Sequence, residues 1–257
     1  MIEDVNFEHR KWGYFADVPS HEDLLYSAGS APRPLTVDLS PQFKNQVEDQ
    51  KTLGSCVANA CVSALEYLLA KKNANNPNYR YPELSRLFAY YYARKASGLE
   101  SVDRGSFIRD CVDQLRKVGV CEESVWPYFL NSVNVAPDEF SIEDAKSNKV
   151  GSAFRVESLD DKLDCLAQGY PFAFGFMVFE NSINQAGRTG VISLPSGSRG
   201  GGHAVLAVGY DMNKQMFLVR NSWGNNWGVN GYFWMPFEYL INPNLSSDYW
   251  TIRTFGD

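Results

Sequence analysis

The segment QKTLGSCVANACVSALEYLLAKK, residues 50–72, decides how the rest of the chain is interpreted. Its apolar residues recur at steps of three and four, which predicts a largely buried helix from Cys56 to about Lys72. Ser55 stands at the N-cap position, where its side-chain oxygen is expected to accept a free backbone N–H. Cys56 would then lie in the first turn, where the helix dipole favours a thiolate. The position of Cys56 alone does not distinguish a catalytic nucleophile from a cysteine that is buried as a small apolar residue.

The composition is that of an ordinary folded protein. Its 257 residues are 44% hydrophobic and 21% charged, enough for one large domain or two small lobes. The formal net charge of -6 argues against a nucleic-acid partner, because nucleic-acid-binding surfaces are basic. No apolar run approaches the roughly 20 residues that a membrane span needs. We therefore expect neither nucleic acid nor membrane as a partner.

Cysteine and histidine are scarce, and this narrows the candidates for catalysis. There are five cysteines, so at least one thiol is unpaired, and any pairing of the other four is left open: Cys56, Cys61, Cys111, Cys121 and Cys165. Their spacing matches no C-x-x-C zinc pattern, so no metal is expected. Of the three histidines, two lie within the first 21 residues. His203 is therefore the only imidazole that the body of the protein can offer to Cys56.

The first 35 residues differ from the rest. Prolines and glycines interrupt any regular pattern there, so residues 1–35 are interpreted as an irregular strap or short pro-like segment ahead of a main domain over residues 36–257. No basic stretch followed by an apolar core is present, so no signal peptide is expected in the chain as given. Secretion stays open if a signal preceded Met1, and the localisation is not assigned.

Helical patterns dominate the first half and strand patterns the second. We expect a mainly helical part over about 50–130 and a mainly β part over about 150–250. The individual helices are expected over residues 84–96, 107–118 and 160–168, and the strands over 172–179, 189–194, 204–210 and 216–220.

The last two strands predict a hairpin with a decisive geometry. A turn centred on Met212 places His203, nine residues before it, opposite Asn221, nine residues after it. Facing side chains of an antiparallel pair lie close enough to interact, so the Asn221 amide is expected to accept a ring N–H of His203. The inference depends on the turn, because a slip of one residue would put the two side chains on opposite faces.

Together these residues predict a Cys-His-Asn arrangement for nucleophilic catalysis. Cys56 would be the nucleophile, His203 the base and Asn221 the group that orients the base. Gln50 can supply a side-chain N–H which, with the backbone N–H of Cys56, would hold the oxyanion of a tetrahedral intermediate. Each residue alone has an ordinary structural explanation, and their joint occurrence in this order is what favours catalysis.

This sequence resembles the papain-like cysteine peptidases, family C1, and in particular the shorter bacterial members. The matching pieces are residues 50–56, GGHAVLAVGYD at 201–211 and NSWGNNWGVNGYF at 221–233. The resemblance implies an α+β, two-lobe fold, with a helical lobe, an antiparallel β-barrel lobe and the active-site cleft between them. It also implies that Trp223 shields the His203–Asn221 contact from water. The familiar disulfides of the family cannot all form here, since Leu53 stands where many members carry a cysteine.

The resemblance further implies an extended protein or peptide substrate in the cleft. Five residues would line the pocket for the second residue before the scissile bond: Gly105, Phe107, Gly175, Gly202 and Ala204. These small, uncharged walls suggest an apolar preference. The paired histidines of an exopeptidase-type occluding loop are missing, which favours a cysteine endopeptidase. No cofactor is expected, and the chain is expected to be a monomer.

Two other classes of function stay open. A catalytically silent binding protein on a peptidase fold would retain the core without turnover, and cleavage of a fluorogenic peptide would exclude it. A different Cys-His acyl transferase would incorporate amines without hydrolysis. Such enzymes usually orient the histidine with a carboxylate, so Asn221 in its NSWG segment argues against this class.

Overall fold

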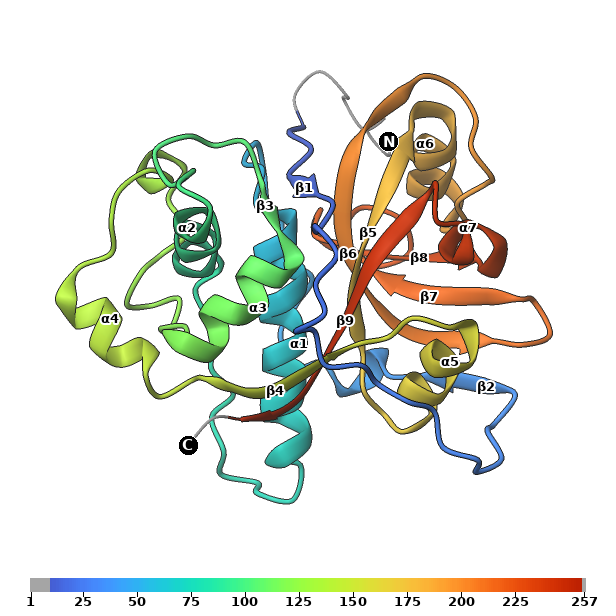
Figure 1. The fold of residues 1–257 in the computed structure, drawn as a ribbon, viewed down its shortest axis with the longest axis horizontal. Helices are drawn as coiled ribbons and strands as arrows, with labels where there is room; N and C mark the ends of the chain where they lie inside the picture. Colours follow the sequence, from blue (N-terminus) through green and yellow to red (C-terminus); the bar gives the residue numbers. More distant parts are fainter. Residues whose placement is uncertain (1–9, 256–257) are drawn as a thin grey trace.

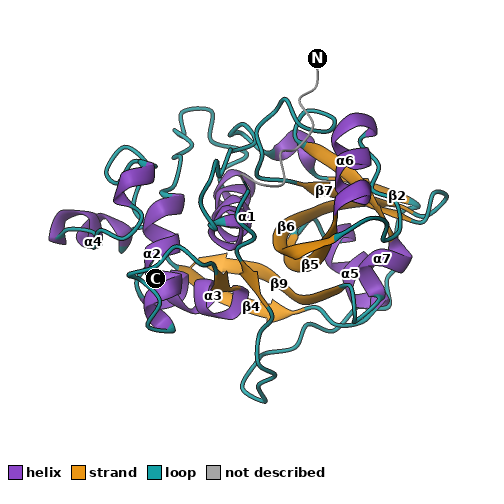
Figure 2. Cartoon of the chain, turned by 90° about the horizontal axis from the view of Figure 1, so that it is seen from above, coloured by secondary structure: helices purple, strands orange, loops and turns teal. Residues whose placement is uncertain are grey.

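The computed structural model describes residues 10–255. The helices between residues 56 and 145 lie toward one side of the molecule, and most of the antiparallel sheet lies on the other side with the later helices around it (Figures 1 and 2), so the expected α+β class is confirmed. The N-terminal segment carrying β1 (Tyr14–Phe15) passes between the two sides in Figure 1. Within the described range, no helix combines the length and apolar character that crossing a bilayer requires.

Helix α1 (Cys56–Lys72) is the centre of the fold, and it has the predicted bounds. Nearly all of its residues are buried, because helices pack on one side of it and strand β6 (Arg199–Asp211) on the other. Ser55 is the N-cap residue, but its side chain accepts no backbone N–H of the first turn. Its hydroxyl is instead paired with the hydroxyl of Tyr128 and accepts the Asn59 amide at 3.0 Å. The predicted capping bond is therefore wrong, although the predicted boundary is right.

The remaining helices surround α1 and the sheet. Helices α2 and α3 pack against α1, and α5, α6 and α7 lie around the sheet (Figure 1). Gly119 ends α3 with a positive φ of 91°, as expected for a helix-terminating glycine. Their bounds are α2 (Arg86–Ala96), α3 (Ile108–Lys117), α4 (Glu139–Ala145), α5 (Leu159–Ala167), α6 (Glu180–Thr189) and α7 (Phe237–Ile241).

The main sheet has the strand order β4-β9-β5-β6-β7-β8, with β2 paired to the end of β6. Within the described residues β4 and β8 do not pair, so the sheet is open, and the expected closed barrel is corrected to an open antiparallel sheet. A separate two-stranded sheet joins β1 to β3 (Ser106–Phe107) in parallel. The other strands are β2 (Thr36–Asp38), β4 (Val150–Arg155), β5 (Phe172–Phe179), β7 (Met216–Arg220), β8 (Tyr232–Pro236) and β9 (Ser246–Phe255).

The hairpin of β6 and β7 differs from the predicted register. Leu206 pairs with Arg220, and a bulge lies between Ala207 and Gly209. Continued by one residue, this register sets Asn221 opposite Val205, two residues from His203. Because side chains alternate with a period of two, this offset keeps the two side chains on one face as diagonal neighbours.

All five cysteines lie within the described residues, and all are free and buried. The odd number of cysteines required only one unpaired thiol. In this structure none of the other four cysteines forms a disulfide either.

Candidate active site

The imidazole of His203 is fixed by Asn221. The ring Nε2 lies 2.8 Å from Oδ1 of Asn221, and the same oxygen accepts the backbone N–H of Ser222 at 2.9 Å. An amide oxygen that already accepts one N–H favours the tautomer in which Nε2 is also a donor. The other ring nitrogen, Nδ1, is buried and makes no hydrogen bond. The sequence-predicted pair is thus brought together, with Nδ1 left to act on a neighbour.

Aromatic rings enclose this pair. Trp223 stacks on His203 with ring centroids 4.7 Å apart and an interplanar angle of 23°. Phe176 of β5 approaches the imidazole edge-on at 5.7 Å. Both rings are buried, so they keep bulk water from the hydrogen bond between His203 and Asn221. Trp223 therefore lies where its expected shielding role requires.

Cys56 is the first residue of α1 and meets the start of β6. Its thiol is fully buried, and the backbone of Ala204, the residue after His203, lies close enough to lower the pKa of the thiol. The backbone of Gly13, in the N-terminal segment, acts on the pKa in the same direction. The first residue of the central helix thus lies next to strand β6 at the residue that follows His203.

Gln50 lies beside this contact, with its amide held from both ends. Its Nε2 donates to the carbonyl of Leu53 at 2.9 Å, which uses one of two amide hydrogens. Its Oε1 accepts from the hydroxyl of Ser222 at 2.8 Å and from the indole of Trp223 at 3.2 Å. Sequence reasoning missed Ser222, although it lies inside the NSWG segment. It also missed Tyr128, whose hydroxyl donates to the Gln50 carbonyl at 2.9 Å, and no motif marks that residue.

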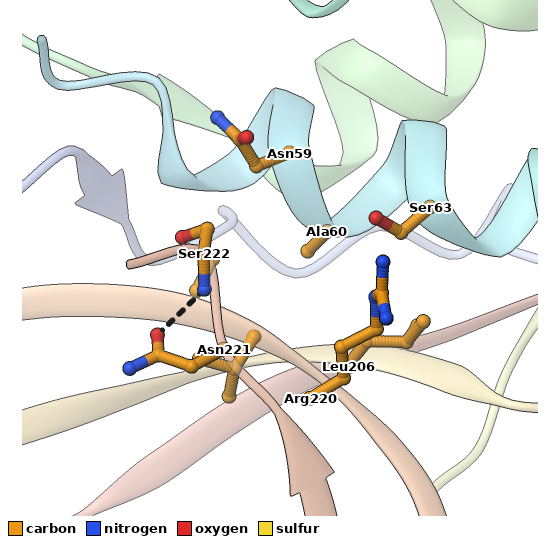
Figure 3. A pocket seen from close by; sticks show the side chains of 9 residues that line it. Asn59, Ala60, Ser63, Leu206, Arg220, Asn221 and Ser222 are labelled. Atoms are coloured by element: carbon orange, nitrogen blue, oxygen red, sulfur yellow. Dashed lines mark hydrogen bonds between the residues drawn. The ribbon is translucent and has the colours of Figure 1, made fainter. Parts of the chain in front are cut away.

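A small cavity of about 10 Å³ lies beneath the site, between α1 and the strands β6 and β7. Figure 3 shows Asn221 and Ser222 on one side of it and Asn59, Ala60 and Ser63 of α1 on the other. The cavity has room for about one water molecule. It is too small for a substrate group, so the reactive residues are not approached from this side.

Residues 10–26, hereafter the strap, cover the opposite side. The Gly13 carbonyl accepts the N–H of Ser106 at 2.9 Å, and β1 continues this pairing along β3. The Trp12 ring lies 6.1 Å from the imidazole of His203, and the Arg10 guanidinium lies 4.6 Å above the Trp223 ring. The strap therefore lies directly over the thiol and the imidazole.

The residues expected to line the substrate pocket all gather beneath this strap. A Cβ built on Gly105 would lie 2.4 Å from the Gly13 carbonyl oxygen. One built on Gly202 would lie 2.5 Å from the Tyr14 carbonyl oxygen, and one on Gly175 would lie 2.0 Å from its ring. Phe107 packs against Phe15 with ring centroids 5.5 Å apart, and Ala204 faces Gly175 across the β5–β6 pair.

A carboxylate lies next to these uncharged walls. Beyond the glycine walls, the Tyr14 hydroxyl donates to Oδ2 of Asp248 at 2.5 Å. Asp248 is buried on β9, outside every motif described above, and no sequence pattern singles it out. The apolar walls thus end at a carboxylate.

Comparison with known proteins decides the family. The model of the papain family cysteine proteases matches residues 33–239, which include Cys56, His203 and Asn221. This chain belongs to the papain family of cysteine proteases. It is a cysteine-type peptidase, a hydrolase, and the resemblance stated from the sequence is confirmed.

Relatives of this papain-family protease come from bacteria, viruses and animals. The crystal structure of xylellain, a cysteine protease from Xylella fastidiosa, matches with a TM-score of 0.87 and 37% identity, covering 96% of this chain and 97% of that one. An uncharacterised peptidase C1-like protein of Acanthamoeba polyphaga mimivirus is 34% identical, over 99% of this chain and 90% of its own length. Pro-cathepsin H of Bos taurus is 25% identical, over 91% and 70% respectively.

Burial shifts the pKa values of Cys56 and His203 in this papain-family protease toward the neutral form of each group. It raises the pKa of Cys56 to about 11, against the backbone hydrogen bonds from Ala204 and Gly13 that lower it. It lowers the pKa of His203 to about 4, against the hydrogen bond to Asn221, while Arg10 lowers it further. A neutral thiol is a poor nucleophile.

Proposed function

We propose that this protein is an endopeptidase in which Cys56, His203, Asn221 and Gln50 hydrolyse peptide bonds through an acyl-enzyme. The observation that carries the proposal is the hydrogen bond of Asn221 to Nε2 of His203, which leaves Nδ1 as the basic ring nitrogen without a hydrogen-bond partner. Histidine held in this way by an amide matches the roles of a Cys-His-Asn triad.

The reaction proceeds in two halves. The Cys56 thiol gives its proton to Nδ1 of His203, and the sulfur forms a bond to the peptide carbonyl carbon. Gln50 Nε2 and the backbone N–H of Cys56 stabilise the oxyanion. His203 returns the proton to the leaving amine as the C–N bond breaks. Water then attacks the thioester, His203 takes a proton from it, and the C–S bond breaks to release the acid and the thiol.

A peptide substrate would occupy the position that the strap holds here. With the strap gone, the backbone of β3 would offer the substrate the same pairing that β1 uses here. Gly105, Phe107, Gly175, Gly202 and Ala204 would line its side-chain pocket. The described residues contain only two histidines, and His21 lies exposed on the strap. This supports endopeptidase over exopeptidase activity, because no second imidazole closes one end of the site.

The strap must leave for this reaction to occur. It covers a fully buried thiol and separates the imidazole from solvent, so substrate and strap compete for one position. We therefore assign the N-terminal segment a regulatory role in this proposal, with the remainder, from about residue 36, as the peptidase domain.

A single added methyl group tests whether the strap and a peptide substrate compete for the same position. Gly13→Ala would place a Cβ 1.9 Å from the Gly54 carbonyl oxygen, so the strap could no longer seat. Gly29→Ala is the matched control, because its Cβ would approach only the Gln168 side chain, at 4.0 Å. Under reducing conditions we expect casein and fluorogenic peptides to be cleaved at least ten times faster by the Gly13→Ala chain than by the control. Cys56→Ser added to Gly13→Ala should abolish the cleavage.

The outcome separates the classes of function. No cleavage by the Gly13→Ala chain would leave a binding protein on a peptidase fold. Amine incorporation without hydrolysis would instead indicate an acyl transferase.

A further inference from the structure

We propose that the slot now filled by the Tyr14 ring selects tyrosine in substrates, and that Asp248 is the residue that recognises the phenol. The proposal rests on the proposed function, because it names the side chain that the peptidase would accept in that slot. The strap acts as a bound ligand that reveals what the slot fits.

The walls of the slot are shaped for a flat ring. Gly175 of β5 and Gly202 of β6 both lie against Tyr14, and a Cβ on either would overlap the tyrosine. Gly175 pairs with Ser247 of β9, which brings a hydroxyl to the end of the slot. The Tyr14 hydroxyl meets the Ser247 hydroxyl at 2.6 Å and Asp248 Oδ2 at 2.5 Å. A ring that ends in a hydroxyl therefore fits the shape of the slot and forms hydrogen bonds with the groups at its end.

The carboxylate of Asp248 is held in place at an energetic cost. Asp248 has a φ of +58°, a region that few residues other than glycine adopt, within an otherwise extended strand. Its side chain is nearly inaccessible, and Oδ1 is paired with Arg155 at 3.0 Å. The remaining oxygen, Oδ2, faces the strap, where it accepts from Tyr14 and from the Asp17 N–H at 2.7 Å. When the strap leaves, Oδ2 loses both of these donors.

The charges around Asp248 determine which kind of substrate group should replace the two donors that the strap supplies. In the closed form the strap carboxylates of Asp17 and Asp23 lie beside Arg109 and Arg155. Without the strap, those two arginines stand against the single carboxylate of Asp248, an excess of one positive charge. A lysine or arginine side chain would meet that excess, whereas a neutral hydroxyl would not.

Phenylalanine would fit the walls but would supply no donor. A buried carboxylate oxygen left without its partner is costly, and sites built around a substrate hydroxyl reject the analogue that lacks it. We therefore expect the order tyrosine, then phenylalanine, then lysine.

The first test uses the strap itself and needs no turnover. Tyr14→Phe in the full chain removes only the hydroxyl, so the strap should open more often. Alkylation of Cys56 by iodoacetamide, followed by peptide mapping, should be about ten times faster than in the wild type. Phe15→Leu is the control for a conservative change in the neighbouring ring. Equal rates for Tyr14→Phe and wild type would overturn the proposal.

The second test uses substrates. Fluorogenic peptides that differ only at the second residue before the scissile bond (Tyr, Phe or Lys) are compared with the Gly13→Ala full chain. We expect kcat/KM for tyrosine to exceed that for phenylalanine about tenfold or more. Asp248→Gly should reduce this ratio to below about three, and glycine suits the positive φ of that position, so folding is retained. Thermal unfolding checks the fold of this variant.

The two tests separate two kinds of failure. Cleavage without preference for tyrosine over phenylalanine overturns the slot proposal and leaves the peptidase proposal intact. Faster alkylation of Tyr14→Phe without cleavage of any peptide supports the slot and contradicts the peptidase proposal.

Discussion

His203 and Asn221 share a hydrogen bond of 2.8 Å, and the Asn221 oxygen that accepts it also accepts the backbone N–H of Ser222. The backbone N–H of Ser222 therefore fixes the Asn221 side chain, which in turn fixes the orientation of the imidazole. Asn221→Ala would leave the ring N–H buried without a partner and the tautomer unfixed.

For Asn221→Ala in the Gly13→Ala chain, we expect kcat to fall about 10- to 100-fold with a smaller change in KM. The exposed Asn226 of the same segment provides the control, Asn226→Ala, which should retain full activity. Steady-state kinetics on a fluorogenic peptide measure both. An unchanged kcat for Asn221→Ala would remove Asn221 from the mechanism.

Gln50 is predicted to act as a donor to the oxyanion. Gln50→Glu keeps an acceptor for Ser222 and Trp223 but loses the Nε2–H, whereas Gln50→Ala loses both functions. We expect each variant to reduce kcat about 100- to 1,000-fold, as removal of one oxyanion donor does elsewhere. If Gln50→Glu retained more than a third of the kcat, the side chain would be structural only.

The strap is held by a charged latch as well as by β1. Arg109 donates to Asp23 through Nε at 2.8 Å and through Nη2 at 2.5 Å, and both side chains are largely buried. Asp23→Ala leaves the arginine without this pair. In the full chain we expect peptide cleavage to rise about tenfold, whereas the exposed neighbour Glu22→Ala should change it little. The same activity for both variants would show that the latch does not hold the strap closed.

Glu66 makes stability depend on pH. Burial raises its pKa to about 7 from 4.5, against a hydrogen bond from the Leu84 N–H at 2.8 Å. Because the pKa of Glu66 is higher in the folded state than in the unfolded chain, protonation of Glu66 favours the folded state. This contribution to stability is fully present below about pH 4.5 and is lost as the pH rises through about 7. Glu66→Gln keeps an acceptor and removes the charge.

We therefore expect Glu66→Gln to raise the unfolding temperature by several degrees at pH 8, corresponding to about 1–3 kcal/mol, and to change it little at pH 5. Glu143→Gln is the control on an exposed side chain. A destabilised Glu66→Gln at pH 8 would contradict this account of Glu66.

Periodic patterns in the sequence predicted most of the elements that position the site. Residues 172–179 and 216–220 form strands with the predicted bounds, and α1 begins and ends as expected. The expected strand over 189–194 is wrong: Thr189 ends helix α6, and Val191 makes only an isolated bridge. A short, mixed stretch of this kind carries no strong period, so neighbouring elements decide its structure.

The site was predictable in its residues but not in its exact geometry. The predicted register of the hairpin was wrong by two residues. His203 and Asn221 are nevertheless in contact, because a shift of two residues keeps both side chains on the same face of the sheet. The contact of the strap with Asp248 could not be foreseen, since it joins segments more than 200 residues apart.

The central claim is that Cys56 and His203 react as a pair once the strap is displaced. The pH dependence of Cys56 alkylation by iodoacetamide, mapped by mass spectrometry, tests it most directly. In the Gly13→Ala chain the rate should level off near or below neutral pH, because a neighbouring imidazolium lowers the pKa of the thiol. With His203→Ala added, the same profile should move upward by at least about two pH units. Identical profiles for the two chains would contradict the pairing.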